Sequence, residues 1–413
     1  MSLSIEDYAR VARPEAVERL RQLARPLTGA RVVHVNSTRE GGGVAEILAK
    51  LVPFMNELGM HASWEVLVGE RAFYDCTKRF HNGLQGHVVE LPPALLRAYE
   101  QTNRDNLDRL DTTLREADFV FIHDPQPAPL LRLCGERRGR WFWRCHIDVS
   151  RPHRPVWKYL RPHVADYDAS IFSLADFAQP LPHPQFIVPP SIDPLTDKNR
   201  ELQDEEIRAV RARFGIDPDR PLVAQISRFD RFKDPVGVIR AWRLARRFLP
   251  DVQLVLAGGG ASDDPEGAQV LADVQEAAAA EADCHVLLLP ADAHRTINAL
   301  QRTAAVVLQK SLREGFGLTV AEAMWKGRPV IGGNTGGIRL QIVNHHTGFL
   351  VDTPEGAALR LRYLMDREDL RHEMGEKARR FVRDHFLITR HLAEYLAMMV
   401  ALRRGMSSRV SLS

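Results

Sequence analysis

Short apolar runs alternate along the chain with longer segments in which apolar residues recur every three or four positions. In the first half, residues 31–35 are rich in β-branched side chains, which is typical of a buried strand. The next segment predicts an amphipathic helix, because one stripe carries Val44, Ile47, Leu48, Leu51, Val52, Met55 and Leu58. Pro53 predicts a kink in that helix, and Gly59 is placed to end it.

The same alternation continues along both halves of the chain. Further strand-like runs lie at residues 64–68, 118–123, 141–147, 169–173 and 186–188, and then at 221–227, 252–257, 285–289 and 304–308. In the second half, helix-like segments lie at residues 234–248, 266–281, 294–303 and 318–326. Strands that alternate with helices in this way predict an α/β fold with doubly wound parallel sheets.

A segment rich in Pro, Asp and Ser at residues 189–200 predicts a connection between two domains. We therefore expect an N-terminal domain over residues 1–190 and a C-terminal domain over residues 191–387. Helical spacing near the end of the chain predicts a last helix over about 388–413, which we expect to pack back on the first domain. Open parallel sheets bind ligands beyond the carboxyl ends of their strands, so functional residues are expected in loops that follow strands.

The composition is typical of a globular protein, since 45% of the 413 residues are apolar and 26% are charged. The 56 basic and 53 acidic residues leave a net charge of +3, which gives no case for a nucleic-acid partner. The sequence shows no signal-peptide pattern and no membrane-spanning apolar stretch, so we expect a cytoplasmic protein with no membrane partner. The four cysteines form no CxxC pair, which argues against a disulfide framework and a zinc site.

A glycine-rich loop lies between the first strand and the first amphipathic helix, at residues 36–43 (NSTREGGG). Its three glycines would let the backbone approach a ligand closely, and the helix that follows favours an anion at its N-terminus. A flexible strand–helix turn has the same composition. The loop is not a G-x-G-x-x-G fingerprint, so an NAD-linked oxidoreductase is not supported.

A pair of cations follows the strand-like run at residues 221–227, in the sequence SRFDRFKD. Arg228 and Lys233 lie between the strand end and the next helix, and both could reach one diphosphate. The Arg guanidinium can bind two phosphate oxygens, and the Lys ammonium adds a point charge. Together they could stabilise the charge on a departing nucleoside diphosphate, although two solvated surface charges would look the same.

The strongest pattern is KSLREGFGLTVAEAM at residues 310–324. A Gly-x-Gly turn at residues 315–317 and a helix that begins near Leu318 would offer free N–H groups to a phosphate. Glu314 is placed on the loop to contact a sugar ring. Glu322 is placed about two helical turns further on to accept hydrogen bonds from two ribose hydroxyls. Two surface carboxylates on an ordinary helix would give the same spacing.

Taken together, these motifs resemble those of the retaining glycosyltransferases of family 4. The similarity is closer to the trehalose glycosyltransferring synthases, and it runs over nearly the whole chain. Besides the three motifs, it is carried by VHVNSTREGGGVAEIL at residues 33–48, by CHID at residues 145–148, and by QKSLREGFGLTVAEAMWKGRPVIG with the later Gly336-Gly337-Ile338.

The resemblance implies a GT-B fold, in which two Rossmann-like, doubly wound domains face a deep inter-domain cleft. The N-terminal domain would bind the acceptor and the C-terminal domain the nucleotide-sugar donor. The implied reaction moves glucose from NDP-glucose (ADP-, UDP- or GDP-glucose) to glucose, giving α,α-trehalose and NDP reversibly, with retention at the transferred carbon. Glu314 would orient the sugar and stabilise charge, while the leaving phosphate takes the acceptor proton.

The resemblance also assigns roles to individual residues. The implied catalytic residues are Glu314, His146, Arg228 and Lys233. The implied donor-binding residues are Gly42, Gly43, Arg228, Lys233, Gly317, Leu318, Thr319 and Glu322. The implied acceptor-binding residues are Asn36, Asp124, His146 and Asp148. We expect no tightly bound cofactor, although Mg²⁺ can accompany the nucleoside diphosphate, and no metal site, because His146 and Asp148 have no third ligand nearby in the sequence.

Several alternatives stay open at this point. A trehalose phosphorylase, which would use phosphate instead of a nucleotide, shares the fold and the motifs in family terms. Another family 4 transferase with a different acceptor is also compatible, and so is a non-catalytic sugar-nucleotide-binding protein. The sequence does not define the nucleobase or the oligomeric state, for which a homodimer is one expectation.

Overall fold

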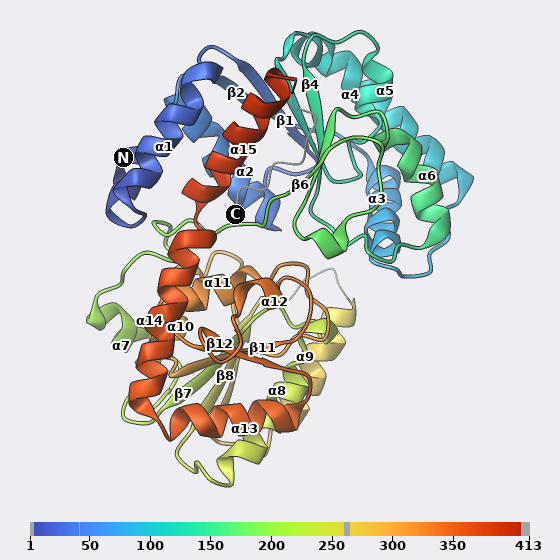
Figure 1. The fold of residues 1–413 in the computed structure, drawn as a ribbon. Helices are drawn as coiled ribbons and strands as arrows, with labels where there is room; N and C mark the ends of the chain where they lie inside the picture. The colour runs from blue at the N-terminus through green and yellow to red at the C-terminus, as the bar shows by residue number, and fades with distance from the viewer. Residues whose placement is uncertain (1–3, 41, 260–264, 406–413) are drawn as a thin grey trace. The chain divides into compact units, whose positions relative to one another are not determined.

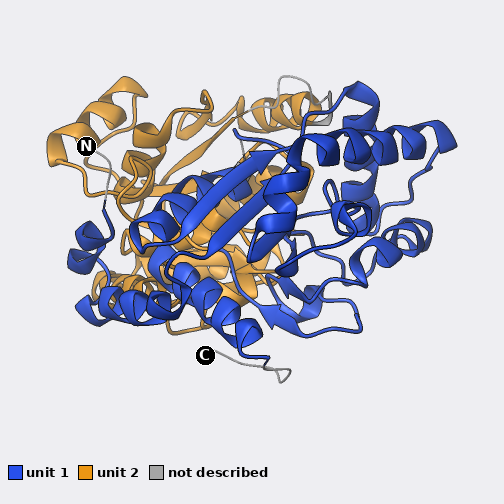
Figure 2. Cartoon of the chain, turned by 90° about the horizontal axis from the view of Figure 1, so that it is seen from above, with its two compact units in different colours: residues 1–190, 388–413 blue, residues 191–387 orange. Residues whose placement is uncertain are grey.

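A computed structural model describes residues 4–40, 42–259 and 265–405 of the chain. The chain forms two compact units, one of residues 1–190 and 388–413 and the other of residues 191–387 (Figure 2). Each unit contains a parallel β-sheet flanked by helices (Figure 1).

The first unit is built on a parallel sheet with the strand order β2-β1-β3-β4-β5-β6. Its strands are β1 (Arg31–Asn36), β2 (His61–Val66), β3 (Phe119–His123), β4 (Arg140–Cys145), β5 (Ala169–Phe172) and β6 (Gln185–Ile187). The central strands β3 and β5 are buried along their whole length, as expected for a parallel sheet covered on both faces.

Helices from both ends of the chain cover this sheet. They are η1 (Ile5–Arg10), α1 (Pro14–Ala24), η2 (Arg25–Leu27), α2 (Gly42–Glu57), α3 (Arg71–Leu84), α4 (Pro93–Glu116), α5 (Leu130–Cys134), α6 (Arg154–Val164), η3 (Ala175–Phe177) and α15 (Ile388–Arg403). The last of these, α15, packs against α1, α2 and η2 (Figure 1). The C-terminal end of the described chain therefore belongs to the first unit.

The second unit is built on a parallel sheet with the order β12-β11-β10-β7-β8-β9. Its strands are β7 (Leu222–Ile226), β8 (Gln253–Gly258), β9 (Cys284–Leu288), β10 (Val306–Gln309), β11 (Val330–Gly333) and β12 (Gly348–Val351). Its helices are α7 (Asp204–Arg213), η4 (Arg231–Lys233), α8 (Pro235–Arg246), α9 (Pro265–Ala278), α10 (His294–Thr303), α11 (Leu318–Trp325), α12 (Ile338–Gln341), α13 (Pro354–Met365) and α14 (Glu368–His385). The expected α/β fold with doubly wound parallel sheets is confirmed.

The glycine-rich loop differs from its expected form. Helix α2 already begins at Gly42 and includes Gly43, so these glycines form its first turn instead of a preceding loop, and Gly41 lies outside the described residues. The helix runs on through Pro53, and Gly59 follows its end with φ 88°, as expected for a terminating glycine.

In both units, the chain adds strands on one side of the first strand and then continues on its other side. In the first unit the chain moves from β1 to β2 and then returns to β3 on the other side of β1, and in the second unit β10 returns beside β7. Such a switch point leaves an open crevice at the carboxyl ends of the two central strands, where ligands bind in this class of fold. The loops after β1, β3, β7 and β10 are therefore the places to look for a site.

Across the described residues, no helix has both the length and the apolar character needed to cross a membrane.

Candidate active site

The loop after β7 carries both predicted phosphate-binding cations. Arg228 has an exposed side chain and donates a hydrogen bond to Asp230 at 3.3 Å. Asp230 caps η4 by accepting a hydrogen bond from the backbone N–H of Phe232 at 2.7 Å. Lys233 ends this short helix, and its carbonyl accepts a hydrogen bond from Nε2 of Gln225 in β7 at 2.8 Å. The strand end therefore fixes the backbone from which the Lys233 side chain projects.

Lys233 and Glu314 form an ion pair across the switch point of the second unit. Nζ of Lys233 lies 2.5 Å from Oε2 of Glu314, and only 18% and 9% of the two side chains are exposed. Oγ of Ser311 donates to the same carboxylate oxygen at 3.2 Å. A sugar phosphate bound to Lys233 would thus lie beside a carboxylate whose position is fixed by two partners.

Two glycines hold the loop that carries Glu314. Gly336 has φ 45°, and a Cβ at this position would lie 1.7 Å from the carbonyl oxygen of Glu314. The N–H of Gly337 donates to the carbonyl of Gly315 at 2.9 Å. The loop therefore takes its position from a backbone approach that a side chain at Gly336 would prevent.

The turn after Glu314 leads into α11 with the geometry of an anion site. Gly317 is the N-cap residue with φ 83°, and Leu318 and Thr319 are the first residues of the helix. Nε2 of the buried Gln341 donates to the carbonyl of Phe316 at 2.5 Å and fixes the turn from behind. The first N–H groups of a helix have no partner within it and point toward an incoming ligand.

Glu322 is buried, with 3% of its surface exposed, and Nζ of Lys198 lies 3.8 Å from its Oε1. The buried ammonium of Lys326 donates to the carbonyl of Glu322 at 3.1 Å, to Asn199 at 2.9 Å and to Gln301 at 2.8 Å. Burial lowers the pKa of Lys326 to about 7. The predicted connecting segment at residues 189–200 therefore contributes Lys198, which lies beside the Glu322 carboxylate, and Asn199, which binds Lys326.

A second buried ion pair joins the same two loops. Lys310, which is 3% exposed, pairs with the carboxylate of Asp234. Asp234 has φ 52° and caps α8 through a hydrogen bond from the N–H of Gly237 at 3.2 Å. Sequence reasoning gave Lys310 no role. Its position directly after a buried strand could have indicated a role, because a buried ammonium group needs an acidic partner.

The loops after β3 and β4 bring two predicted acceptor-binding residues together in the first unit. Asp124 has φ 63°, and its Oδ1 accepts a hydrogen bond from the backbone N–H of His146 at 2.7 Å. The backbone N–H of Asp124 donates to the carbonyl of Arg144 at 2.8 Å, and Trp143 donates to the carbonyl of Asp124 at 3.1 Å. Burial raises the pKa of the Asp124 carboxyl to about 6. This corner is therefore fixed by its own backbone and side-chain bonds.

The side chains of Asn36 and Asp148 already form hydrogen bonds within the first unit. Asn36 is buried, donates to the carbonyl of Thr38 at 2.7 Å and accepts from Trp64 at 2.8 Å. Asp148 accepts a hydrogen bond from the backbone N–H of Ser150 at 2.9 Å. Both side chains hold their own loops, and their part in acceptor binding stays a prediction.

Sequence reasoning also missed two histidines beside His146. Nε2 of His146 lies 3.1 Å from Nδ1 of His123, whose Nε2 lies 3.1 Å from Nδ1 of His34. A signal was present in the sequence, because each of these residues is a polar residue in or just after an otherwise apolar strand.

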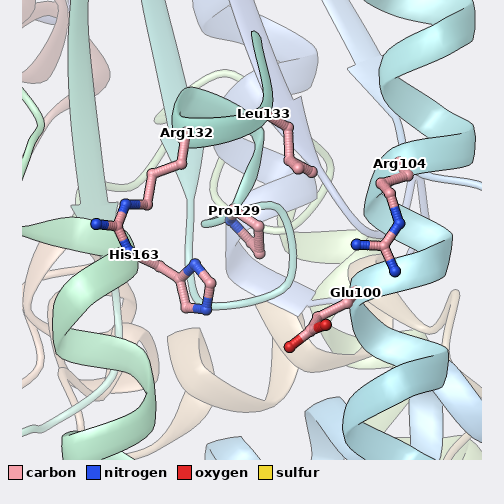
Figure 3. Close-up of a pocket in the computed structure, with 6 residues that line it drawn as sticks. All are labelled: Glu100, Arg104, Pro129, Arg132, Leu133 and His163. Carbon is pink, nitrogen blue, oxygen red and sulfur yellow. The ribbon is translucent and has the colours of Figure 1, made fainter. Parts of the chain in front are cut away.

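A pocket of about 280 Å³ lies elsewhere in the first unit, between α4, α5 and α6 (Figure 3). It is lined by Glu100, Arg104, Pro129, Arg132, Leu133 and His163. Its charged groups bind neighbouring residues, since Arg132 pairs with Asp166 at 3.1 Å and Glu100 accepts a hydrogen bond from Tyr159 at 2.8 Å. None of the predicted site residues lines this pocket.

Within the part of the chain that the structure describes, no group of three or more His, Cys, Asp or Glu residues is arranged to hold a metal ion. The four cysteines are free thiols, and three of them are buried.

The sequence matches two family models and several known proteins. The family model of the trehalose synthase N-terminal domain matches residues 34–179, and the model of glycosyl transferases group 1 matches residues 206–381. The trehalose synthase of Thermococcus litoralis is 44% identical over 96% of both chains. The trehalose phosphorylase of Grifola frondosa is 30% identical over 89% of this chain and only 57% of its own length.

Solved structures agree on the fold. The UDP-forming α,α-trehalose-phosphate synthase of Burkholderia xenovorans superposes with a TM-score of 0.72 at 14% identity, over 91% of this chain and all of that one. At this identity the likeness concerns the fold, which is GT-B.

Proposed function

Because the chain belongs to the trehalose synthase family of glycosyltransferases, we propose that it makes α,α-trehalose by moving glucose from a nucleoside diphosphate to free glucose. The enzyme is a glycosyltransferase. Its acceptor, its nucleotide and retention at the transferred carbon are parts of the proposal.

The observation that carries the proposal is the Lys233–Glu314 pair beside the N-terminus of α11. In the proposed complex, Lys233, Arg228 and the first N–H groups of α11 would bind the diphosphate, and Glu314 would lie next to it. Glu322 would accept hydrogen bonds from the ribose hydroxyls, as its position one turn inside α11 allows. The family resemblance assigns Gly42 and Gly43, in the first turn of α2, to donor binding.

In the proposed reaction, the bond between C1 of glucose and the β-phosphate oxygen breaks, and C1 bonds to O1 of the acceptor glucose on the same face. The acceptor proton passes to the departing phosphate. Arg228 and Lys233 stabilise the negative charge on the leaving group. Glu314 stabilises the positive charge that develops on the sugar ring, while Asp124 and His146 orient the acceptor and the reacting sugar.

The test is a substrate panel. Purified protein is incubated with glucose and each of ADP-, UDP- and GDP-glucose, and the disaccharide and the NDP are measured by chromatography. Formation of equal amounts of trehalose and NDP with at least one donor supports the proposal. Release of glucose 1-phosphate from trehalose and phosphate, with no turnover of any nucleotide sugar, would assign the chain to the phosphorylases instead.

A further inference from the structure

Three imidazoles form a continuous row across three neighbouring strands of the first unit. His34 lies in β1 opposite Phe121 of β3, and His123 lies two residues further along β3. His123 in turn lies opposite Arg144 of β4, and His146 lies two residues beyond that. Because residues two apart on a strand share a face, the offsets bring the three rings together on one side of the sheet. The ring nitrogens of consecutive members are 3.1 Å apart at both junctions.

The row is buried at one end and accessible at the other. His34 is fully buried, and its Nε2 has no hydrogen-bond partner among the described residues. His146, at the other end, is partly exposed. Tyr395 of α15 covers the buried end, with its ring centroid 6.1 Å from that of His34.

All three imidazoles are neutral at physiological pH. Burial lowers the pKa of His34 to about 3 and holds the pKa values of His123 and His146 well below their usual range. The titratable groups around the row act in the same direction: Arg144 from β4 lowers the pKa of His123 and His146, and His391 from α15 lowers that of His146.

A neutral row has only two possible arrangements of its protons. Each ring carries one N–H, so three protons are available, and the two junctions use one each. The third proton lies either on Nε2 of His34 or on Nδ1 of His146. A buried N–H without an acceptor is among the rarest defects of native structures, whereas a buried acceptor without a donor is tolerated more often. The third proton therefore belongs on His146.

We propose that His34 and His123 are positioning residues that fix the tautomer of His146, so that His146 presents Nδ1–H as a hydrogen-bond donor to an oxygen of the reacting sugar. His34 donates from Nδ1 to Nε2 of His123, and His123 donates from Nδ1 to Nε2 of His146.

This inference rests on the proposed function, and it adds a consequence for the mechanism. An imidazole that carries its proton on the nitrogen facing the substrate donates a hydrogen bond and cannot remove a proton there. His146 therefore does not act as the general base toward the acceptor, which agrees with proton transfer to the departing phosphate.

The inference is tested on the full-length protein labelled with ¹⁵N in its histidine rings. Long-range ¹H–¹⁵N correlation spectra distinguish protonated from unprotonated ring nitrogens, and the His146 signals are assigned by their loss in His146→Asn. The expected result is a protonated Nδ1 and an unprotonated Nε2 in His146. A His146 ring protonated on Nε2 would overturn the inference.

Two variants of His123 separate its hydrogen bond from its bulk. Asparagine places an amide near the position of Nδ1 and can still donate to His146, whereas leucine cannot. We expect His123→Leu to lose the single tautomer of His146 and to lower kcat about tenfold to a hundredfold, the range for one hydrogen bond in a transition state. His123→Asn is expected to keep the His146 spectrum and most of kcat, and His372→Asn, at an exposed position, serves as the control.

The outcomes separate this inference from the proposed function. If the native protein transfers glucose but His123→Leu leaves both the His146 tautomer and kcat unchanged, the positioning role is wrong. If the native protein shows the expected tautomer but transfers no sugar to glucose, the proposed function is wrong and the tautomer stands.

Discussion

At the scale of single residues, the site depends on charges whose positions are fixed by neighbours. Glu314 has Lys233 at 2.5 Å and Ser311 at 3.2 Å, so its carboxylate is oriented before any sugar arrives. Preorganised charge of this kind stabilises a transition state at no cost of rearrangement. The role of Glu314 therefore rests on its charge more than on its shape.

Glu314→Gln keeps the size of the side chain and removes the charge. We expect kcat to fall about a hundredfold or more, with a smaller change in the KM for the donor, because the charge matters most when positive charge develops on the sugar. Steady-state kinetics with varied donor check this. The control is Glu355→Gln, an exposed residue paired with Arg240, and an equal kcat in native protein and Glu314→Gln would remove any central role for Glu314.

Asp124 gives the protein a predictable dependence of stability on pH. Its pKa of about 6 in the folded state lies above the unfolded value of 3.8, so the folded state binds more protons between these limits. The contribution of this carboxyl to the free energy of unfolding therefore rises as the pH falls, by about 1 kcal/mol from pH 7 to pH 5.

Asp124→Asn removes this titration and keeps the acceptor for the N–H of His146, and asparagine also tolerates the positive φ. Urea unfolding at pH 5, 6 and 7 should show native protein gaining stability relative to the variant as the pH falls. A constant difference between the two proteins over this range would contradict the elevated pKa.

At the scale of the elements, both candidate regions lie at the carboxyl ends of neighbouring strands, at the switch point between β7 and β10 in the second sheet and beside the switch point between β1 and β3 in the first. The ends of β7 and β10 bring Lys233 to Glu314, and the ends of β3 and β4 bring Asp124 to His146. Short loops and glycines then determine where the individual side chains lie. Gly336 is the most constrained of them, because a Cβ there would overlap the backbone of Glu314.

Gly336→Ala should displace the Glu314 loop. We expect a loss of about 1–3 kcal/mol in the free energy of unfolding, together with a large loss of kcat, because the clash adds to the strain of a positive φ. The matched control is Gly215→Ala, which has φ 65° and no atom within 4 Å of the added Cβ, so it reports the strain alone. Equal effects of the two substitutions on kcat would show that the contact with Glu314 is unimportant.

The sequence predicts the regular elements well where periodicity is strong. Helix α10 begins and ends at the predicted residues, and ten of the strands lie at or close to the predicted runs. The strands β11 and β12 lie outside the predicted runs. Each contains glycine, which is depleted in strands and interrupts the apolar run.

The sequence predicts which residues within a single loop could bind a ligand, but it does not predict which loops come together. The ion pair of Lys233 with Glu314 joins residues 81 positions apart, and the pair of Lys310 with Asp234 joins residues 76 apart. Neither partner can be chosen from charge alone, because the strand order β10-β7 that brings them together is a tertiary property. The histidine row was missed for the same reason.

At the scale of the whole molecule, the first unit contains both the N-terminal part of the chain and its last helix. Helix α15 returns after the entire second unit and packs against α1, and Tyr395 lies 5.0 Å from Phe121 in the sheet, ring centre to ring centre. Arg390 also donates to the carbonyls of Pro189 and Pro190 at 2.9 and 3.1 Å, which ties the returning helix to the point where the first unit ends. The last helix is therefore part of the first unit's core.

Tyr395→Ala tests this closure. Tyr395 is 1% exposed, so we expect its truncation to cost about 3–5 kcal/mol in the free energy of unfolding, as for other buried aromatic side chains. Denaturant unfolding followed by circular dichroism measures the loss. Tyr363→Ala, at a site 38% exposed, is the control and should cost far less; similar losses in both variants would argue against a packed α15.

The proposed enzyme transfers glucose with retention from a nucleotide sugar to glucose. The most direct measurement follows the product by NMR, with ADP- or UDP-glucose labelled with ¹³C at C1 of the sugar and unlabelled glucose as acceptor. We predict that the label appears in one α-configured anomeric carbon of a 1,1-linked disaccharide, with NDP formed in equal amount. A β-configured product, or recovery of all the released label as free glucose, would contradict the proposed retaining transfer.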